Sequence, residues 1–266
     1  MKITLFTSNS LRHKYLIYLL SKICSKLYVI QENKTLFPGK LKSRYKLSKK
    51  IEKYFDNVKL SEKKLFKIPN FQTKNIKYFQ LAYGDLSFVK INELKEFLKS
   101  NLYIVFGASF IKGKLLRYLI KKKAINIHMG VSPFYRGTDC NFWALLDLNP
   151  HLVGATVHML SKSIDGGKVL FHAFPYKKKN PFDFTMLSVM AAFKGLQKKI
   201  KNKEVFKIKP ITQKKSLLIR YSKKKDFNES TLKHYKNLKK KIFYSLQTVN
   251  RAKILNNLTN PYILTN

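Results

Sequence analysis

Residues 125–137 read INIHMGVSPFYRG, and residues 154–170 read GATVHMLSKSIDGGKVL. INIH predicts a short strand, and the period-two alternation of a strand places Asn126 and His128 on one side near its carboxyl end. Ligands of open α/β sheets bind beyond the carboxyl ends of the strands. Asp165 follows the next apolar strand, in an IDGG turn whose glycines permit tight backbone geometry. These three polar side chains are therefore the candidate catalytic residues.

Each residue type suits one part of an acyl-transfer reaction. Asn126 can donate an amide N–H to a developing oxyanion, and His128 can move a proton or donate from an imidazolium. Asp165 can orient or charge an imidazole, or accept a proton from a nucleophile. Taken singly, a histidine at a strand end and an aspartate before Gly-Gly are more often structural than catalytic, and that alternative stays open on the residues alone.

Short apolar runs alternate with amphipathic stretches along the chain. This alternation predicts an α/β domain with a mostly parallel sheet. The expected strands cover residues 2–6, 27–30, 102–107, 124–129, 154–160 and 168–174. The expected helices cover residues 11–23, 88–100, 112–123, 141–148 and 181–201.

Two parts of the chain differ from this pattern. Residues 31–88 are lysine-rich, with weak helical periodicity around 46–55, and remain unassigned. Residues 206–266 carry 15 basic residues against two acidic ones, Asp226 and Glu229. We therefore expect a catalytic domain over 1–205 and a small, mainly helical, basic appendage over 206–266.

The net charge of +40 comes from 54 basic and 14 acidic residues, and only six of the basic residues are arginine. Such a charge favours an anionic partner such as a nucleic acid or an anionic membrane surface. Arginine is, however, the preferred residue for bidentate contacts with bases and phosphates. A lysine excess can also be a compositional background that says little about partners. Residues 124–171 hold three basic and three acidic residues. This segment has no net charge and holds the three candidate catalytic residues, which argues against nucleic-acid binding as the whole function.

Composition excludes several classes of protein. The chain is 45% hydrophobic, which is too apolar for a disordered protein. Its 266 residues are enough to bury a sizeable core. No apolar run approaches the roughly 20 residues of a membrane-spanning helix, and MKITLF does not begin a signal peptide. Two cysteines, Cys24 and Cys140, are too few for a disulfide framework or a thiolate zinc site. We expect a cytoplasmic protein without a metal.

The quoted stretches resemble the folate-dependent formyltransferases, which include enzymes acting on glycinamide ribonucleotide, methionyl-tRNA and amino sugars. Asn126, His128 and Asp165 match the family's catalytic triad. Pro133, Arg136 and Gly137 match its following loop, and His158 in GATVHM matches a second histidine near the site in part of the family. VFGASFIKG at 105–113 resembles the segment that lines the folate pocket. The resemblance is strong over residues 100–175 and weak before them.

This resemblance implies a Rossmann-like formyltransferase domain that takes a formyl group from 10-formyltetrahydrofolate and transfers it to a primary amine. The residues that it assigns to the folate site are Phe110, Ile111, Lys112, Ser163 and Ile164. Those assigned to the acceptor are Arg12, His13, His158, Arg136 and Gly137.

The acceptor follows by analogy and elimination. TSNSLRHK at 7–14 is a polar strand-to-helix turn that can meet an anion, yet it lacks the glycines of the purine enzyme's phosphate turn. The residues after 205 are too few for the barrel of the tRNA enzyme. We therefore expect the acceptor to be a nucleotide-linked amino sugar that is destined for surface polysaccharide. A tRNA-directed enzyme, a formyltetrahydrofolate hydrolase and a non-catalytic basic binding protein remain alternatives, and homodimer formation is left open.

Overall fold

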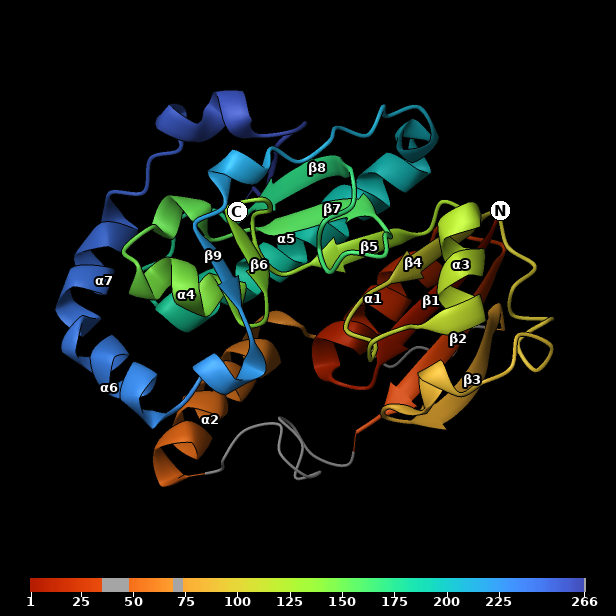
Figure 1. Cartoon of the computed structure of the whole chain (residues 1–266), viewed down its shortest axis with the longest axis horizontal. Coiled ribbons are helices and arrows are strands. Elements are labelled where there is room, and N and C mark those ends of the chain that lie inside the picture. The colour runs from red at the N-terminus through yellow and green to blue at the C-terminus, as the bar shows by residue number, and fades with distance from the viewer. Residues whose placement is uncertain (35–47, 69–73, 266) are drawn as a thin grey trace.

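The computed structural model describes residues 1–34, 48–68 and 74–265, and an eight-stranded sheet is its centre (Figure 1). The strands of this sheet lie in the order β10-β8-β7-β5-β4-β1-β2-β3. In chain order they are β1 (Lys2–Ser8), β2 (Lys26–Asn33), β3 (Ile76–Ala82), β4 (Leu102–Val105), β5 (Ile125–His128), β7 (Ala155–Met159), β8 (Val169–Phe174) and β10 (Tyr262–Ile263). Two further strands, β6 (Tyr135–Gly137) and β9 (Arg220–Ser222), form a separate parallel pair.

The sheet is mostly parallel, as the alternation of strands and helices predicts. β1 pairs in parallel with β2 and β4, and β4 pairs in parallel with β5. β7 breaks the pattern, because it runs antiparallel to both β5 and β8. The carboxyl ends of β1, β2, β4 and β5 therefore meet at one edge of the sheet.

Helices cover both faces of the sheet (Figure 1). The helices are α1 (Leu11–Ser21), α2 (Lys49–Leu65), α3 (Gly113–Lys121), α4 (Cys140–Leu146), α5 (Pro181–Lys201), α6 (Glu229–Asn237) and α7 (Lys239–Gln247). α5 has the end signals of a long helix, because Asn180 accepts hydrogen bonds from the first-turn amides and Pro181 fills the first position. Within the described residues, no helix combines the length and the apolar character needed to cross a membrane.

The strands bury both of their faces. In β1, Leu5 packs in the larger core cluster with α1 and α5, whereas Phe6 belongs to a second cluster with residues of α3 such as Leu119. In β2, Val29 likewise packs in the larger cluster and Ile30 in the second. This alternation is expected of a sheet covered by helices on both sides.

Several expected elements are confirmed and one is wrong. The helix expected over 88–100 is a series of turns, with Glu93 N–H donating to Lys90 O (3.0 Å) and Leu94 N–H to Ile91 O (3.1 Å). The apolar spacing still buries Leu94, Phe97 and Leu98, because successive turns bring every third or fourth residue to the core as a helix does. The unassigned segment supplies α2 and β3; residues 46 and 47 of the expected periodicity lie outside the described residues.

The residues after 205 are mainly helical and contact the sheet closely. β10 extends the main sheet beside β8, and β9 pairs with β6. Phe227 and Ile242 join the same core cluster as α2, α4 and α5. The C-terminal residues therefore form part of the surroundings of β6.

Candidate active site

Asn126 and His158 lie opposite each other on neighbouring strands. β5 and β7 pair in antiparallel register with Asn126 against His158, so that their side chains share one face of the sheet. The amide Nδ2 of Asn126 lies 3.0 Å from Nε2 of His158, whose Nδ1 lies 2.9 Å from the carbonyl oxygen of Met159. In the neutral ring Nδ1 carries the proton and Nε2 accepts from Asn126, whereas a ring protonated on both nitrogens would turn the Nε2 N–H toward Asp165. The second N–H of this amide is left to donate to an oxygen in the cavity.

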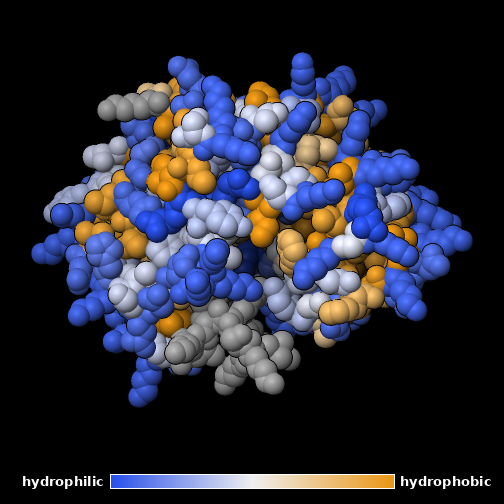
Figure 2. Space-filling model, viewed as in Figure 1, coloured by the Kyte–Doolittle hydropathy of each residue, from blue (hydrophilic) through white to orange (hydrophobic). Residues whose placement is uncertain are grey.

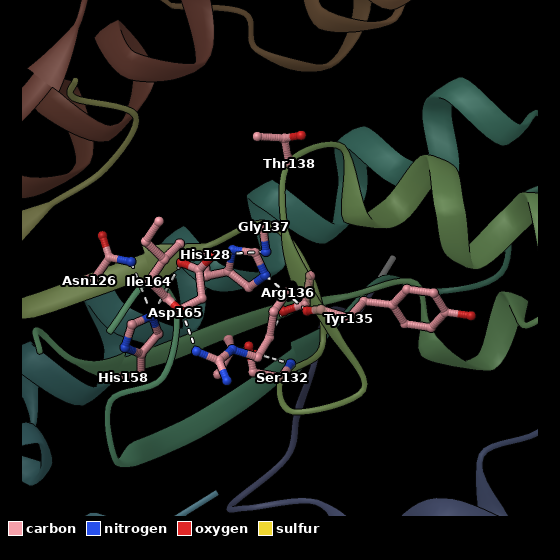
Figure 3. A network of polar contacts seen from close by, with 12 residues as sticks. Asn126, His128, Ser132, Tyr135, Arg136, Gly137, Thr138, His158, Ile164 and Asp165 are labelled. Carbon is pink, nitrogen blue, oxygen red and sulfur yellow. Dashed lines mark hydrogen bonds and ion pairs between the residues drawn. The ribbon is translucent and has the colours of Figure 1, made fainter. Parts of the chain in front are cut away.

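Asp165 lies between the two histidines (Figure 3). One carboxylate oxygen is 3.3 Å from Nδ1 of His128 and 3.8 Å from Nε2 of His158, and the other accepts the backbone N–H of Gly137 at 3.1 Å. Burial acts to raise the pKa of Asp165, but the charge of His128, the contact with His158 and the Gly137 amide together lower it to about 2. Asp165 is therefore an anion at neutral pH.

The glycines of the IDGG turn allow Asp165 to reach this place. A Cβ on Gly167 would lie 1.7 Å from the carbonyl oxygen of Met159, so no larger residue fits there without moving the strand. Asp165 itself has a φ of 49°. Gln213 donates to the carbonyl oxygens of Asp165 and Gly167, both at 2.8 Å. The turn is thus held by β7 on one side and by the C-terminal residues on the other.

Both ring nitrogens of His128 face oxygen atoms. Nδ1 faces Asp165, and Nε2 lies 3.2 Å from the carbonyl oxygen of Tyr135. Burial lowers the pKa of His128, while the Asp165 carboxylate and the Tyr135 carbonyl oppose that shift. The pKa of His128 is lowered overall, so the ring is neutral at neutral pH and can accept a proton.

A cavity of about 630 Å³ runs over these side chains. In the space-filling view the face is hollowed near its centre, and hydrophilic side chains spread around it rather than gathering in one patch (Figure 2). One part of the cavity wall is apolar and comes from the connection between β4 and α3 and from the end of β7. The other part comes from α1, α2, α4 and α5 and from three charged residues outside these helices, Lys34, Asp139 and Lys224; Arg12 is the charged side chain that the helices contribute. A site with one apolar and one charged part can hold two substrates side by side.

Eleven of the thirteen residues predicted for the site line this one cavity. They are Arg12, His13, Phe110, Ile111, Asn126, His128, Gly137, His158, Ser163, Ile164 and Asp165. Lys112 and Arg136 do not line it. The Lys112 ammonium lies 5.6 Å from the centre of the Phe110 ring, and the Arg136 guanidinium binds the carbonyl oxygen of Ile164 and lies over Tyr221.

Arg12 is held by a carboxylate that the sequence did not single out. Glu62 of α2 accepts both the backbone N–H and the guanidinium of Arg12, each at 2.8 Å. Tyr54 and Phe55 of α2 and Lys34 also line the cavity. The aromatic pair in the weakly periodic stretch 46–55 was the available signal for α2. Among the described residues, no group of three or more His, Cys, Asp or Glu side chains could hold a metal ion.

No protein-family model matches the sequence, and no curated protein matches it. Solved structures do match. A 4-N formyltransferase from Francisella tularensis is 17% identical, with 91% of this chain and 86% of that chain covered and a TM-score of 0.53. A formyltransferase from Anoxybacillus kamchatkensis, solved with UDP-4,6-dideoxy-4-formamido-L-AltNAc and tetrahydrofolate, is 18% identical over 95% and 100% of the two chains (TM-score 0.52).

Phosphoribosylglycinamide formyltransferase from Anaplasma phagocytophilum is 16% identical over 84% of this chain and 98% of that chain, with a TM-score of 0.52. This chain has the fold of the formyltransferases. The predicted Rossmann-like formyltransferase architecture is thereby confirmed. In this formyltransferase fold, the Asn-x-His strand and the Asp-Gly-Gly turn meet at one cavity, as the spacing of the motif requires.

Proposed function

We propose that this protein transfers the formyl group of 10-formyltetrahydrofolate to the amino group of a nucleotide-linked amino sugar. The observation that carries the proposal is the convergence of Asn126, His128 and Asp165 on one cavity of the formyltransferase fold. The carboxylate and the imidazole are already within 3.3 Å of each other.

The reaction joins the acceptor nitrogen to the formyl carbon and breaks the bond from that carbon to the folate nitrogen. Negative charge develops on the formyl oxygen, where Asn126 has an N–H to donate. One such donor contributes about 3–4 kcal/mol of transition-state stabilisation in comparable sites. The proton of the attacking amine passes to the pair formed by His128 and Asp165, and that pair returns it to the departing folate nitrogen. Asp165 thus stabilises the protonated form of His128.

The apolar part of the cavity supports the choice of donor. Phe110, Ile111, Leu116 and Leu160 line it, and Asn126 lines the same cavity. A flat, aromatic ring system such as a pteridine is suited to a wall of this kind. Its formyl group would then lie beside the polar triad.

The charged part of the cavity supports the choice of acceptor. Arg12, Lys34 and Lys224 line it, whereas Asp139 and Asp165 also line the cavity and Glu62 pairs with Arg12. These basic side chains, in a chain of net charge +40, can attract an anionic substrate such as a nucleoside diphosphate. The similar protein from Anoxybacillus kamchatkensis was solved with a UDP-linked formamido sugar and tetrahydrofolate.

Calorimetry with 5-formyltetrahydrofolate, a stable analogue of the donor, tests the folate site. We expect saturable binding that Asp165→Ala weakens. Absence of binding by the folded wild-type protein would overturn the proposal. Formyl transfer to a panel of UDP- and dTDP-linked amino sugars then tests the acceptor. Preferential formylation of aminoacyl-tRNA would overturn the proposed acceptor and leave the proposed donor in place.

A further inference from the structure

The segment 106–112 joins β4 to α3 and carries Phe110 and Ile111 to the cavity; we call it the donor loop. It lies at the edge of the sheet where the parallel strands β1 and β2 also end (Figure 1). Glu32 is the penultimate residue of β2 and lies opposite Ser8 of β1. Its side chain therefore projects at the level of this loop.

Glu32 is fully buried. One carboxylate oxygen accepts the backbone N–H of Ser109 (2.5 Å), and the other accepts the Ser109 hydroxyl (2.6 Å) and the backbone N–H of Gly84 (2.8 Å). A buried carboxylate costs free energy unless such donors compensate it. All three donors belong to loops, two of them to the donor loop. The carboxylate and the loops therefore fix each other.

We infer that Glu32 is a positioning residue that fixes the donor loop in its folate-binding shape. Two other contacts lie on either side of the loop's central part: Thr7 donates to Phe106 O (2.9 Å), and Ser87 donates to Phe110 O (2.5 Å). Ser109 lies between these two points, directly before Phe110. Glu32 acts through Ser109 and does not itself line the cavity. The inference rests on the proposed function, since it assigns the loop to the donor.

A loop held in its bound shape loses less entropy when its ligand binds. Removing the Glu32 contacts should therefore weaken donor binding and leave the acceptor and the chemical step unchanged. Hydrogen bonds to a charged group are stronger than those between neutral partners, so the loss in donor affinity should be about tenfold or more.

The experiment compares Glu32→Gln, Ser109→Ala and the double variant with wild type. The readouts are the calorimetric Kd for 5-formyltetrahydrofolate, the KM of each substrate and kcat. We expect the donor Kd and KM to rise about tenfold in each single variant, with acceptor KM and kcat within about twofold of wild type. The double variant should bind no more weakly than Glu32→Gln alone, because the hydroxyl bond that Ser109→Ala removes is one of those that depend on the Glu32 carboxylate.

Thr4→Val is the matched control, because it removes a buried hydroxyl that donates to Phe97 O elsewhere on the sheet. It should lower thermal stability without changing donor Kd. Ser109→Ala keeps the inference testable if Glu32→Gln does not fold. Unchanged donor affinity in a folded Ser109→Ala variant, equal losses for donor and acceptor, or additive effects in the double variant would each overturn the inference. Absence of folate binding by wild type would instead overturn the proposed function and this inference with it.

Discussion

The backbone carbonyl oxygen of Tyr135 lies 3.2 Å from Nε2 of His128. The hydroxyl of the same tyrosine donates to Asp147 (3.1 Å) and accepts from Asn149 (2.9 Å), and Asp147 in turn binds Arg220 of β9. The contact with the proposed catalytic imidazole is thus made by the backbone, and the side chain anchors that backbone to α4 and β9.

Tyr135→Phe should therefore separate stability from catalysis. It removes the hydroxyl's two hydrogen bonds and should lower the free energy of unfolding by about 1–2 kcal/mol. The carbonyl that faces His128 remains, so kcat should fall less than tenfold. Thermal unfolding and steady-state rates check both expectations. Tyr221→Phe, which alters an exposed hydroxyl on β9, is the control, and an unchanged Tm for Tyr135→Phe would contradict the anchoring role.

Asp165→Asn should abolish most of the turnover while leaving the fold in place. The amide keeps the size of the side chain but removes the negative charge that favours the protonated form of His128. General acid–base groups contribute about 10²–10⁴-fold, so a fall in kcat of that size is expected. Initial rates at saturating substrates, with circular dichroism as the check on folding, measure it. Asp56→Asn, at an exposed ion pair of α2, should retain full activity; comparable rates in both variants would remove Asp165 from the mechanism.

The candidate site could be predicted from the sequence because its residues lie in short motifs whose geometry is local. Asn126 and His128 alternate along one strand, and Asp165 is placed by a turn whose glycines are visible in the sequence. The long helix α5 could also be predicted from the sequence, since Pro181 marks its beginning and apolar residues recur along it. These signals depend on neighbours along the chain.

The missed features depend on tertiary contacts. β3 lies at the edge of the sheet and is only half-buried, so its residues lack the apolar run of a central strand. Glu32 is an ordinary charged residue in the sequence, and only the close approach of β2 to the donor loop makes it a buried acceptor. Lys112 follows Phe110 and Ile111 along the chain, but the beginning of α3 carries its side chain to the surface.

His172 predicts a loss of stability on acidification. Its Nε2 donates to Ser132 O (2.7 Å) and its Nδ1 accepts the N–H of Thr259 (2.9 Å), so the neutral ring satisfies both contacts. Burial lowers the pKa of His172 from 6.5 to about 4. Between those two values the unfolded chain binds a proton that the native protein does not, so stability falls as pH falls. The contribution of this residue reaches about 3 kcal/mol.

His172→Gln should reduce that pH dependence. Urea unfolding at several values between pH 7 and pH 4 gives the slope for each protein, and the wild-type slope should be the steeper. Other groups, including His128, also contribute to the wild-type slope, so the difference between the two proteins is the relevant quantity. Parallel slopes would show that His172 is not held neutral in the native protein.

Gly137→Ala should damage the site through β9. Gly137 has a φ of 96°, and a Cβ there would lie 2.0 Å from the carbonyl oxygen of Ser222. The substitution must therefore separate β6 from β9, and it should cost about 2–4 kcal/mol of stability. Because Gly137 N–H also donates to Asp165, kcat should fall at least tenfold and the pKa of Asp165 should rise.

Gly113→Ala is the matched control for backbone strain. Gly113 has a φ of 61°, but nothing lies within 4 Å of the position that a Cβ would take there, so only the strain of a positive φ remains, about 1 kcal/mol. Denaturant unfolding and initial rates of both variants distinguish the two causes. Equal losses in stability would mean that the close approach of Ser222 is relieved at no cost. Full activity in a destabilised Gly137→Ala variant would mean that β6 does not position Asp165 for catalysis.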